Sequence, residues 1–503
     1  MTGFIGSMIT DPNTVAVFLG VLIVVWVLYP RKKFRLPPGP TNWPVIGATI
    51  ELMRSKHGLK IFQQFLDWSQ KYGSIIRVKW IMGDMIIINE INEATDVTRS
   101  SDMAGRMHFH TMDIMTDGRK DIGFADYSDR VKYQRRIAGS ALRNLLLGGR
   151  LETLVHASVE KGMKVFRGRA RSKEAFDPRP LLTLQVYNVI CAMCFDKNFE
   201  LEDEEFQTLY KANSEATDIF SSGLMVDVFP PARYLPRTKA FKRVLELLEF
   251  LSRHIIGEVQ KHKASFDPDN LKDFIDHMLK VEKEAEDEGD KTIALDEVHY
   301  KQMVHDIFLA GSETTSSTLL WILFLLAEFP DVQSKVQEEI DEVVGLSRLP
   351  GTADKPKMPY SEAVMYECMR FATTVPLGVP HRAMCDTSLG GYDIPKDTIV
   401  MINHHALHRD PKEWKYPNDF NPSNFLNENG ELLKPRSFLP FGSGKRACLG
   451  EAIARPEVFM IYTALLQRFG FRFEEGRTRD LSFQNKMLQI LPQPYKVIAE
   501  ERQ

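Results

Sequence analysis

Residues 441–450 read FGSGKRACLG, and this stretch decides how the rest of the chain is interpreted. It places Cys448, one of only five cysteines, in a loop of glycines and positive charge rather than in an apolar segment. Such surroundings lower the pKa of a thiol and let another group approach the backbone closely. Apolar residues recur at helical spacing through residues 451–469, so Cys448 is predicted to lie just before a helix N-terminus, where free N–H groups favour a thiolate. We therefore expect a group bound to this sulfur.

Composition limits the function classes. At 503 residues the chain is long enough for two or three domains, or for one large α-rich core. The net charge of −3, without a long basic stripe interleaved with aromatic residues, argues against a nucleic-acid partner. The cysteines are sparse, odd in number and mostly in apolar segments, which is typical of a reducing compartment rather than of a disulfide framework. They are Cys191, Cys194, Cys368, Cys385 and Cys448.

The N-terminus carries a topological signal. Residues 15–29, VAVFLGVLIVVWVLY, are uncharged and are followed by Pro30 and RKKFR. A run of about 15 residues is near the short limit for a bilayer-spanning helix, which needs roughly 17 to 25. A cleaved signal peptide is the alternative, but its positive charge precedes the apolar run, and no small-residue cleavage site follows here. We expect residues 1–34 to be an uncleaved membrane anchor with a basic stop, and residues 35–503 to lie in the cytoplasm.

Beyond a proline-rich hinge at residues 36–47 there is no second linker and no repeat, so residues 35–503 are predicted to form one domain. Long amphipathic runs predict helices, and short β-rich pieces predict small sheets at one edge. The expected fold class is therefore mainly α with small β-sheets, preceded by a transmembrane helix. The helical runs are residues 59–71, 241–262, 300–329 and 455–469, and the β-rich pieces are 74–89, 387–403 and 487–499.

A second group of residues, AGSETT at 310–315, interrupts the apolar face of the helix predicted over residues 307–326. Gly311 removes a side chain, and Thr314 can bond back to a carbonyl one turn earlier, so a notch for a small ligand is expected. An acid and an alcohol at this notch, Glu313 and Thr314, could relay protons from water. For the hexapeptide alone, simple packing of Ser and Thr inside a helix is the more common explanation.

Glu367 and Arg370 stand three residues apart on another predicted helix, where an ion pair can form. Most such pairs are solvated and contribute little. Their neighbours in SEAVMYECMRF are largely apolar, however, which predicts a buried pair. A buried pair needs further hydrogen-bond partners.

Together these motifs resemble the cytochrome P450 family. FGSGKRACLG is similar to its haem-binding loop, AGSETT to its oxygen-activating motif, and Glu367 with Arg370 to its Glu-x-x-Arg pair. The order of the motifs, with the anchor and hinge ahead, extends the resemblance over the whole chain. Residues 105–129, 379–394 and 438–455 most resemble animal microsomal enzymes of the steroid 17α-hydroxylase and aryl hydrocarbon hydroxylase kind. The loop matches at five fixed positions, Phe441, Gly444, Arg446, Cys448 and Gly450.

The resemblance implies a haem b cofactor with Cys448 as the axial thiolate and metal ligand, a ligand that favours O–O cleavage. Phe441 is expected beside the sulfur, and Gly444 and Gly450 are expected to let the loop approach the porphyrin. On the opposite face, Glu313 and Thr314 would deliver protons during oxygen activation. The cations expected near the haem propionates are Arg446, Arg135, His381 and Arg106, and Ala310 is expected on the central helix against cofactor and substrate.

Two positions depart from the family pattern. Val131 stands where the family usually has a tryptophan that donates to a propionate, so one haem contact should be missing. Asn424 stands where an arginine is common; an asparagine can hydrogen-bond the Glu367 and Arg370 pair but adds no second charge. Both changes are interpreted as tolerated variation.

The expected function is a monooxygenase of the endoplasmic reticulum membrane that inserts one oxygen atom of O2 into a hydrophobic substrate. No flavin- or nucleotide-binding stretch occurs in the chain, so electrons are expected from NADPH through a separate flavoprotein reductase, with a microsomal cytochrome b as a further partner. Lys132, Arg136 and Lys445 would form a basic patch on the cysteine side that steers an acidic reductase.

A steroid is the favoured substrate class, ahead of xenobiotics, terpenoids and fatty acids. The alternatives are a haem-thiolate isomerase or dehydratase, which commonly lacks the acid and alcohol pair, and a non-enzymatic haem-binding sensor. The expected pocket walls are residues 106–124, residues 214–220, Phe308 with Ala310, and residues 374–379, with His108, His110 and Asn213 as polar points. Cys191 and Cys194 form a lone CxxC in an apolar run and are predicted to be core residues.

Overall fold

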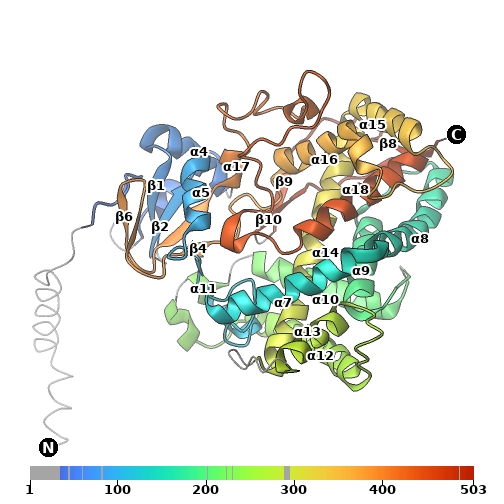
Figure 1. The fold of residues 1–503 in the computed structure, drawn as a ribbon. Coiled ribbons are helices and arrows are strands. Elements are labelled where there is room, and N and C mark those ends of the chain that lie inside the picture. Colours follow the sequence, from blue (N-terminus) through green and yellow to red (C-terminus); the bar gives the residue numbers. More distant parts are fainter. Residues whose placement is uncertain are drawn as a thin grey trace, which may run out of the picture.

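The structure is a computed structural model, and it describes residues 34–502 except 44–45, 59, 81–82, 201, 222–223, 229, 288–294 and 487. The anchor predicted within residues 1–34 therefore lies outside the described residues, apart from Phe34. Within the described part, helices make up most of the molecule, and a small sheet lies at one side of them (Figure 1). The predicted mainly α fold with small sheets is confirmed for these residues.

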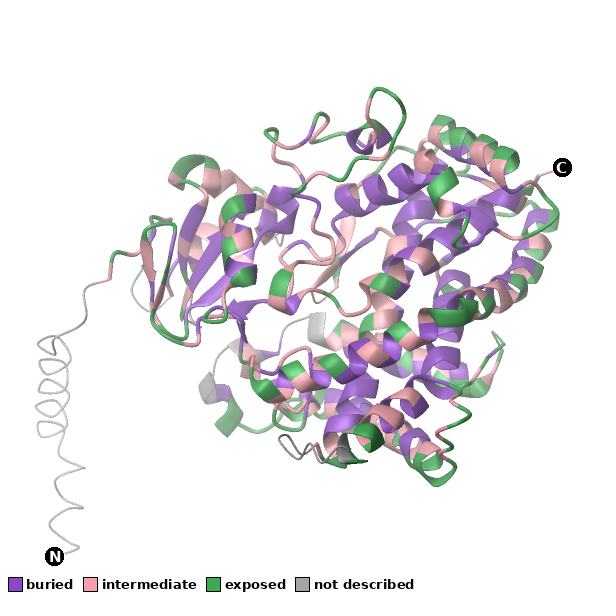
Figure 2. Ribbon diagram, in the orientation of Figure 1, coloured by how far each residue is buried: buried purple, intermediate pink, exposed green. Residues whose placement is uncertain are grey.

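One long helix, α14 (Glu297–Glu328), runs through the middle of the helical part. Asp296 caps its N-terminus in a reciprocal capping box with His299, so its start is well defined. It packs against α9 (Arg179–Phe195), in which every residue from Leu181 to Phe195 is buried. A helix that is apolar on all sides belongs in a core, and Figure 2 shows this central zone as buried.

Helix α14 is also long and apolar enough to cross a membrane by length and composition. Most of its apolar stretch is buried inside the protein, however, as expected of a core helix. The helices predicted over residues 59–71, 241–262, 300–329 and 455–469 correspond to α4, α12, α14 and α18, so all four predictions are confirmed. The remaining α-helices have these bounds: α3 (Thr49–Met53), α4 (Ile61–Tyr72), α5 (Ile91–Arg99), α6 (His110–Met115), α7 (Asp129–Leu146), α8 (Arg150–Ser172), α10 (Glu204–Ser221), α11 (Met225–Val228), α12 (Lys239–Ala264), α13 (Phe274–Asp287), α15 (Pro330–Val343), α16 (Pro359–Ala372), α17 (His404–Leu407) and α18 (Glu451–Arg468).

The main sheet has five strands in the order β1-β2-β7-β4-β3. Neighbours are antiparallel except β2 and β7, which run parallel with Met85 opposite Ile399. The short pair β3–β4 matters for function, because it sets Arg106 directly opposite His381. The strands of this sheet are β1 (Ile75–Trp80), β2 (Gly83–Ile88), β3 (Gly105–Arg106), β4 (His381–Arg382) and β7 (Ile399–Ile402).

Three two-stranded sheets complete the β structure, and the three predicted β-rich pieces are confirmed. Strand β8, directly after α18, pairs with β11 near the end of the chain, and β10 packs against α14. The strands are β5 (Thr387–Leu389) with β6 (Tyr392–Ile394), β9 (Phe483–Lys486) with β10 (Gln489–Pro492), and β8 (Phe469–Arg472) with β11 (Ile498–Glu501).

The predicted Glu367 and Arg370 pair is fully buried on α16, with both side chains 0% exposed. The guanidinium donates to both Glu367 carboxylate oxygens at 2.7 Å. Its remaining N–H groups reach backbone carbonyls of the segment after α17, and these are the further partners that a buried pair requires. The acceptors are His408 O at 2.7 Å, Pro417 O at 2.8 Å, Asp419 O at 2.7 Å and Tyr416 O at 3.3 Å.

Asn424, at the position where the family often has arginine, joins this network. Its Nδ2 donates to the two carboxylate oxygens of Glu367 at 3.2 and 3.3 Å, and its Oδ1 accepts from Tyr416 N at 2.9 Å. The hydrogen bonds expected of an asparagine at this position are therefore present. The network ties α16 to η4 (Pro422–Phe425), a 3₁₀ helix that precedes the cysteine loop.

Replacing Glu367 by glutamine should leave the Arg370 charge buried without its counter-ion. Breaking a buried pair in this way typically costs about 3–5 kcal/mol. We expect Glu367→Gln to lower the thermal unfolding midpoint and the yield of folded protein substantially. The matched control is Glu249→Gln, which removes one partner of an exposed α12 pair, Arg253 with Glu249, and should change stability by less than about 1 kcal/mol. Equal midpoints for the two variants would contradict the structural role of the buried pair.

Candidate active site

The cysteine loop, residues 441–450, contains η5 (Gly444–Arg446), and Cys448 lies between η5 and the start of α18 at Glu451, just before a helix N-terminus as predicted. The backbone N–H of Cys448 donates to Phe441 O at 2.9 Å, which closes the loop. Gly444 has a φ of +66°, and a Cβ added there would lie 2.2 Å from Thr98 O of α5. Only glycine fits this approach. Its contact is with α5, whereas the sequence suggested an approach to the porphyrin.

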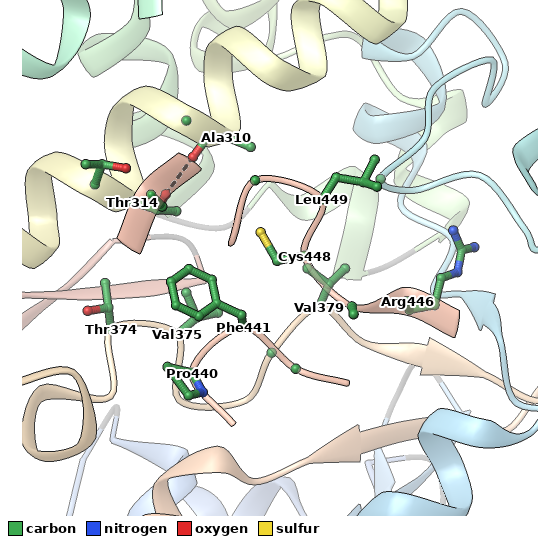
Figure 3. Close-up of a pocket in the computed structure, with 18 of the residues that line it drawn as sticks. Ala310, Thr314, Thr374, Val375, Val379, Pro440, Phe441, Arg446, Cys448 and Leu449 are labelled. Atoms are coloured by element: carbon green, nitrogen blue, oxygen red, sulfur yellow. Dashed lines mark hydrogen bonds between the residues drawn. The ribbon is translucent and has the colours of Figure 1, made fainter. Parts of the chain in front are cut away.

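The side chain of Cys448 faces a large cavity (Figure 3). Its exposed surface opens into this cavity. Burial raises the pKa of the Cys448 thiol, while N–H groups of Gly450 and Glu451 and the charge of Arg135 act to lower it. In the protein alone the pKa is therefore raised, contrary to the lowered value that the loop's composition predicted, because desolvation outweighs the nearby positive charges.

The cavity has a volume of about 370 Å³ and separates the cysteine loop from α14. Figure 3 shows Cys448 and Phe441 on one wall and Ala310 and Thr314 on the other. The two motifs, far apart in the sequence, thus face each other across one space. A third wall comes from residues 373–379, including Thr374, Val375 and Val379.

On the α14 wall, Thr314 Oγ1 donates to Ala310 O at 2.6 Å, the back-bond expected from the sequence. Gly311 also lines the cavity, and a Cβ added to it would lie 2.5 Å from Ile190 Cδ1 of α9. The glycine therefore serves close packing of two buried helices as well as leaving room in the cavity. A larger residue at this position would force the Ile190 side chain to move and would reduce the room in the cavity.

Glu313 points away from this cavity and is not among the described residues that line it. Its Oε1 accepts from Asn213 Nδ2 of α10 at 2.8 Å, and the same Nδ2 donates to Tyr187 OH at 2.8 Å. Burial raises the pKa of Glu313, although Lys486 and the Asn213 bond act to lower it. Asn213 was expected in the pocket wall. It instead hydrogen-bonds Glu313, the residue that precedes Thr314.

All four residues predicted to face the propionates line the cavity: Arg106, Arg135, His381 and Arg446. Burial and the neighbouring Arg135 lower the pKa of Arg446 to about 10. Burial also lowers the pKa of Arg106, and the charges of Arg446 and Arg135 lower it further. Three guanidinium groups therefore repel one another at one side of the cavity, an arrangement that anionic groups of a ligand would stabilise.

His381 differs from these arginines in its charge. Its Nδ1 is 2.9 Å from Met103 O, and burial together with Arg106 lowers its pKa to about 3. It therefore faces the cavity as a neutral imidazole. Val131, where the family usually has tryptophan, is fully buried and is not among the described residues that line the cavity, so a missing haem contact stays a prediction.

These residues fit an iron porphyrin. The cavity offers a single thiol as a soft metal ligand on one wall and a cluster of buried guanidiniums for two carboxylates at its edge. The surrounding surface is mostly apolar, as a macrocycle requires; the cavity residues that contribute it include Leu142, Ile190, Met193, Ile307, Met369, Leu377, Ile402, Leu449, Ile453 and Val458. Cys448 would hold the iron, and Arg106, Arg135 and Arg446 would hold the propionates.

One cavity residue was missed at the sequence level. Asp306, two helical turns before Thr314, lines the cavity, and its Oδ2 accepts from Ile122 N at 2.7 Å. Its only sequence signal is an acid in an otherwise apolar part of the helix. Of the expected pocket walls, residues 214–220, Phe308, His108 and His110 do not appear among the described residues that line the cavity.

Two other clusters carry no active-site chemistry. Cys191 and Cys194 are buried in α9, and burial raises the pKa of both thiols, in agreement with their predicted core role. His262, Asp273 and Asp276 lie close enough to hold a metal. Both ring nitrogens of His262 are already within hydrogen-bond distance of Asp273 Oδ2 and Glu258 O, at 2.5 and 2.8 Å. Burial acts to lower the pKa of His262, but these bonds and the neighbouring carboxylates raise it to about 9, which marks an ion pair.

A cysteine facing a helix notch across an apolar, arginine-edged cavity defines a haem-thiolate enzyme. Comparison with known proteins agrees: residues 37–499 match the family model described as Cytochrome P450. The chain belongs to the cytochrome P450 family, whose members are haem-thiolate monooxygenases.

Similar proteins cover almost the full chain. A steroid 17-alpha-hydroxylase/17,20 lyase from Ictalurus punctatus is 34% identical over 502 residues, covering 97% of this chain and 96% of that protein. Cytochrome P450 2U1 from Homo sapiens is 31% identical and covers 99% of this chain and 96% of its own length. A zebrafish cytochrome P450 structure with progesterone is 33% identical, has a TM-score of 0.80 and covers 88% of this chain and 100% of that one.

Cys448→Ala should remove the thiolate from the cofactor site. We expect the purified, reduced variant to lose the strong red shift of the haem Soret band that a thiolate ligand produces when carbon monoxide is added. The matched control is Cys385→Ala, which changes an exposed free cysteine that does not line the cavity. A retained shift in Cys448→Ala, or its loss in Cys385→Ala, would contradict the assignment of the ligand.

Proposed function

We propose that this chain is a microsomal monooxygenase that inserts one oxygen atom of O2 into a steroid or a similarly apolar substrate. The observation that carries the proposal is the placement of Thr314 and Ala310 on α14 opposite Cys448, across an apolar cavity. The steroid 17-alpha-hydroxylase relative and the zebrafish structure with progesterone support a steroid as substrate. Haem, when bound, supplies the electron transfer and oxygen activation.

The proposed roles of the chain's own groups follow from their positions. The Thr314 hydroxyl lies at the cavity surface and, when it turns from the Ala310 carbonyl, can donate a hydrogen bond into the cavity. Glu313, held by Asn213 on the other side of the helix, is an acid whose pKa is raised by burial, which suits it to pass on a proton. Arg446, Arg135 and Arg106 would fix the cofactor's orientation through its carboxylates.

Electrons are proposed to come from NADPH through a separate flavoprotein reductase, with a microsomal cytochrome b as a further partner. Lys132 and Arg136 are exposed on α7, the helix that also carries Arg135 to the cavity. The same helix approaches the cysteine loop, since a Cβ on Gly139 would lie 3.6 Å from Leu449. These cations suit docking of an acidic partner close to the cysteine side of the cofactor.

The proposed location is the endoplasmic reticulum membrane, with residues 1–34 as a single-pass anchor and the catalytic domain in the cytoplasm. The apolar run and the basic residues after it support this topology. A monooxygenase is favoured over an isomerase, a dehydratase or a haem-binding sensor, because both members of the acid and alcohol pair are present on α14, with Thr314 lining the cavity and Glu313 buried next to it in the sequence.

Thr314→Ala tests the proposed proton delivery. Loss of a positioned general acid typically costs about 100-fold or more, and water can replace part of it, so product formed per NADPH should fall at least about tenfold. Haem content and binding of progesterone should persist, with oxygen released as hydrogen peroxide instead. Ser316→Ala is the matched control, because Ser316 makes the same back-bond, to Ser312 O at 2.7 Å, but is buried and does not line the cavity. Unchanged coupling of NADPH to product in Thr314→Ala would refute the role.

A further inference from the structure

One histidine in the cavity wall has hydrogen-bonding capacity that the chain does not use. His404 is the first residue of α17, lines the cavity and is 8% exposed. Its Nδ1 is buried, and neither ring nitrogen forms a hydrogen bond to another described residue. A neutral imidazole carries one N–H and one lone pair, and leaving such a donor unpaired in a buried place is costly. The ring is therefore suited to a ligand that brings an acceptor into the cavity.

The neighbours of His404 leave its ring open to the cavity. Gly378 also lines the cavity, and a Cβ added to it would lie 3.0 Å from His404 Nε2, so a side chain at this position would crowd the imidazole. His408, another histidine of the cavity wall, is different because both of its ring nitrogens have partners. Its Nδ1 is 3.0 Å from Thr373 Oγ1, and its Nε2 accepts from Leu439 N at 3.2 Å. His404 is thus free to bind a ligand, whereas His408 serves the packing of the chain.

His404 lies at the side of the cavity that carries the arginines. Burial lowers the pKa of His381, and the charge of Arg106 and any charge on His404 lower it further, so these three side chains are near one another. His381 uses its Nδ1–H to donate to Met103 O at 2.9 Å. As a neutral ring it therefore has only a lone pair on Nε2 and cannot donate to a carboxylate. His404 is not committed in this way, so its N–H can add to the donors of the arginines.

We propose that His404 is a further cofactor-binding residue, whose ring N–H donates a hydrogen bond to a carboxylate of the haem and so slows loss of the haem. The role needs no change of protonation, because a neutral imidazole already has one N–H. It also fits the departure at Val131, which can donate nothing from its side chain, since His404 supplies a donor from a different element. The inference rests on the haem site and is independent of the substrate and the electron donor under the proposed function.

The rate of haem loss from the full-length holoenzyme tests this role. Transfer of haem to an excess of apomyoglobin is followed by absorbance, so the readout does not depend on catalysis. His404→Leu removes the donor and should release haem at least about tenfold faster, as expected when a hydrogen bond to a charged group is lost. His404→Gln keeps an N–H donor and should restore most of the retention.

His405→Leu is the matched control. His405 follows His404 on α17, is 5% exposed and also has a buried Nδ1 without a partner, but it is not among the described residues that line the cavity. This variant should lose haem at the wild-type rate. Resonance Raman spectra of the holoenzymes separate a direct bond from general loosening of the site. The bending vibration of the haem propionates should shift in His404→Leu and stay in place in His405→Leu.

Wild-type haem retention or an unchanged propionate vibration in His404→Leu would overturn the proposal, as would equally fast haem loss from His405→Leu. Should His404→Leu fail to fold, His404→Met, which also lacks a donor, takes its place under the same criteria. Failure of the proposed function is distinguishable from these outcomes. A holoenzyme that does not oxidise a steroid would refute that function, whereas the transfer rates and the Raman spectra require only bound haem.

Discussion

The guanidinium of Arg370 is the interaction on which the cysteine side of the molecule depends. It has no exposed surface and joins one carboxylate to four backbone carbonyls in a segment that has little regular structure of its own. Carbonyls in such a segment need donors as much as a buried arginine needs acceptors, so the two requirements satisfy each other. This segment precedes residues 441–450, the loop that carries Cys448.

Different interactions hold the different walls of the cavity in place. The α14 wall is rigid because the helix is buried on nearly every side and packs against α9 across Gly311. The cysteine wall is fixed by backbone contacts, such as the approach of Gly444 to Thr98 O. The edge carries three arginines whose mutual repulsion is offset in part by Asp121 and Asp126 and would be offset further by an anionic ligand. Shape therefore comes from packing, whereas the orientation of a bound cofactor comes from charge.

Much of the fold could be predicted from the sequence, because long amphipathic runs and short β-rich pieces carry a periodic signal. The cysteine loop and the AGSETT stretch could be found from the sequence because each has unusual residues for its surroundings. The loop has a cysteine among glycines and basic residues, and the helix has polar residues and a glycine within an apolar run. The sequence could not show which way several side chains point or whether a buried group is charged. The outward aim of Glu313 toward Asn213, the neutral state of His381 and the inward aim of Asp306 all depend on tertiary packing. The raised pKa of Cys448 was also missed, since composition indicates charge but not burial.

The apolar character of α14 has a consequence for synthesis of the chain. By length and composition this helix resembles a membrane span, and it acquires its burial only through tertiary neighbours. Several of these, including α16, α18 and β10, follow it in the sequence and leave the ribosome later. Until they arrive, the nascent chain exposes the apolar surface of this long helix to its surroundings. The order in which the chain is made therefore leaves α14 prone to aggregation until its later neighbours have folded onto it.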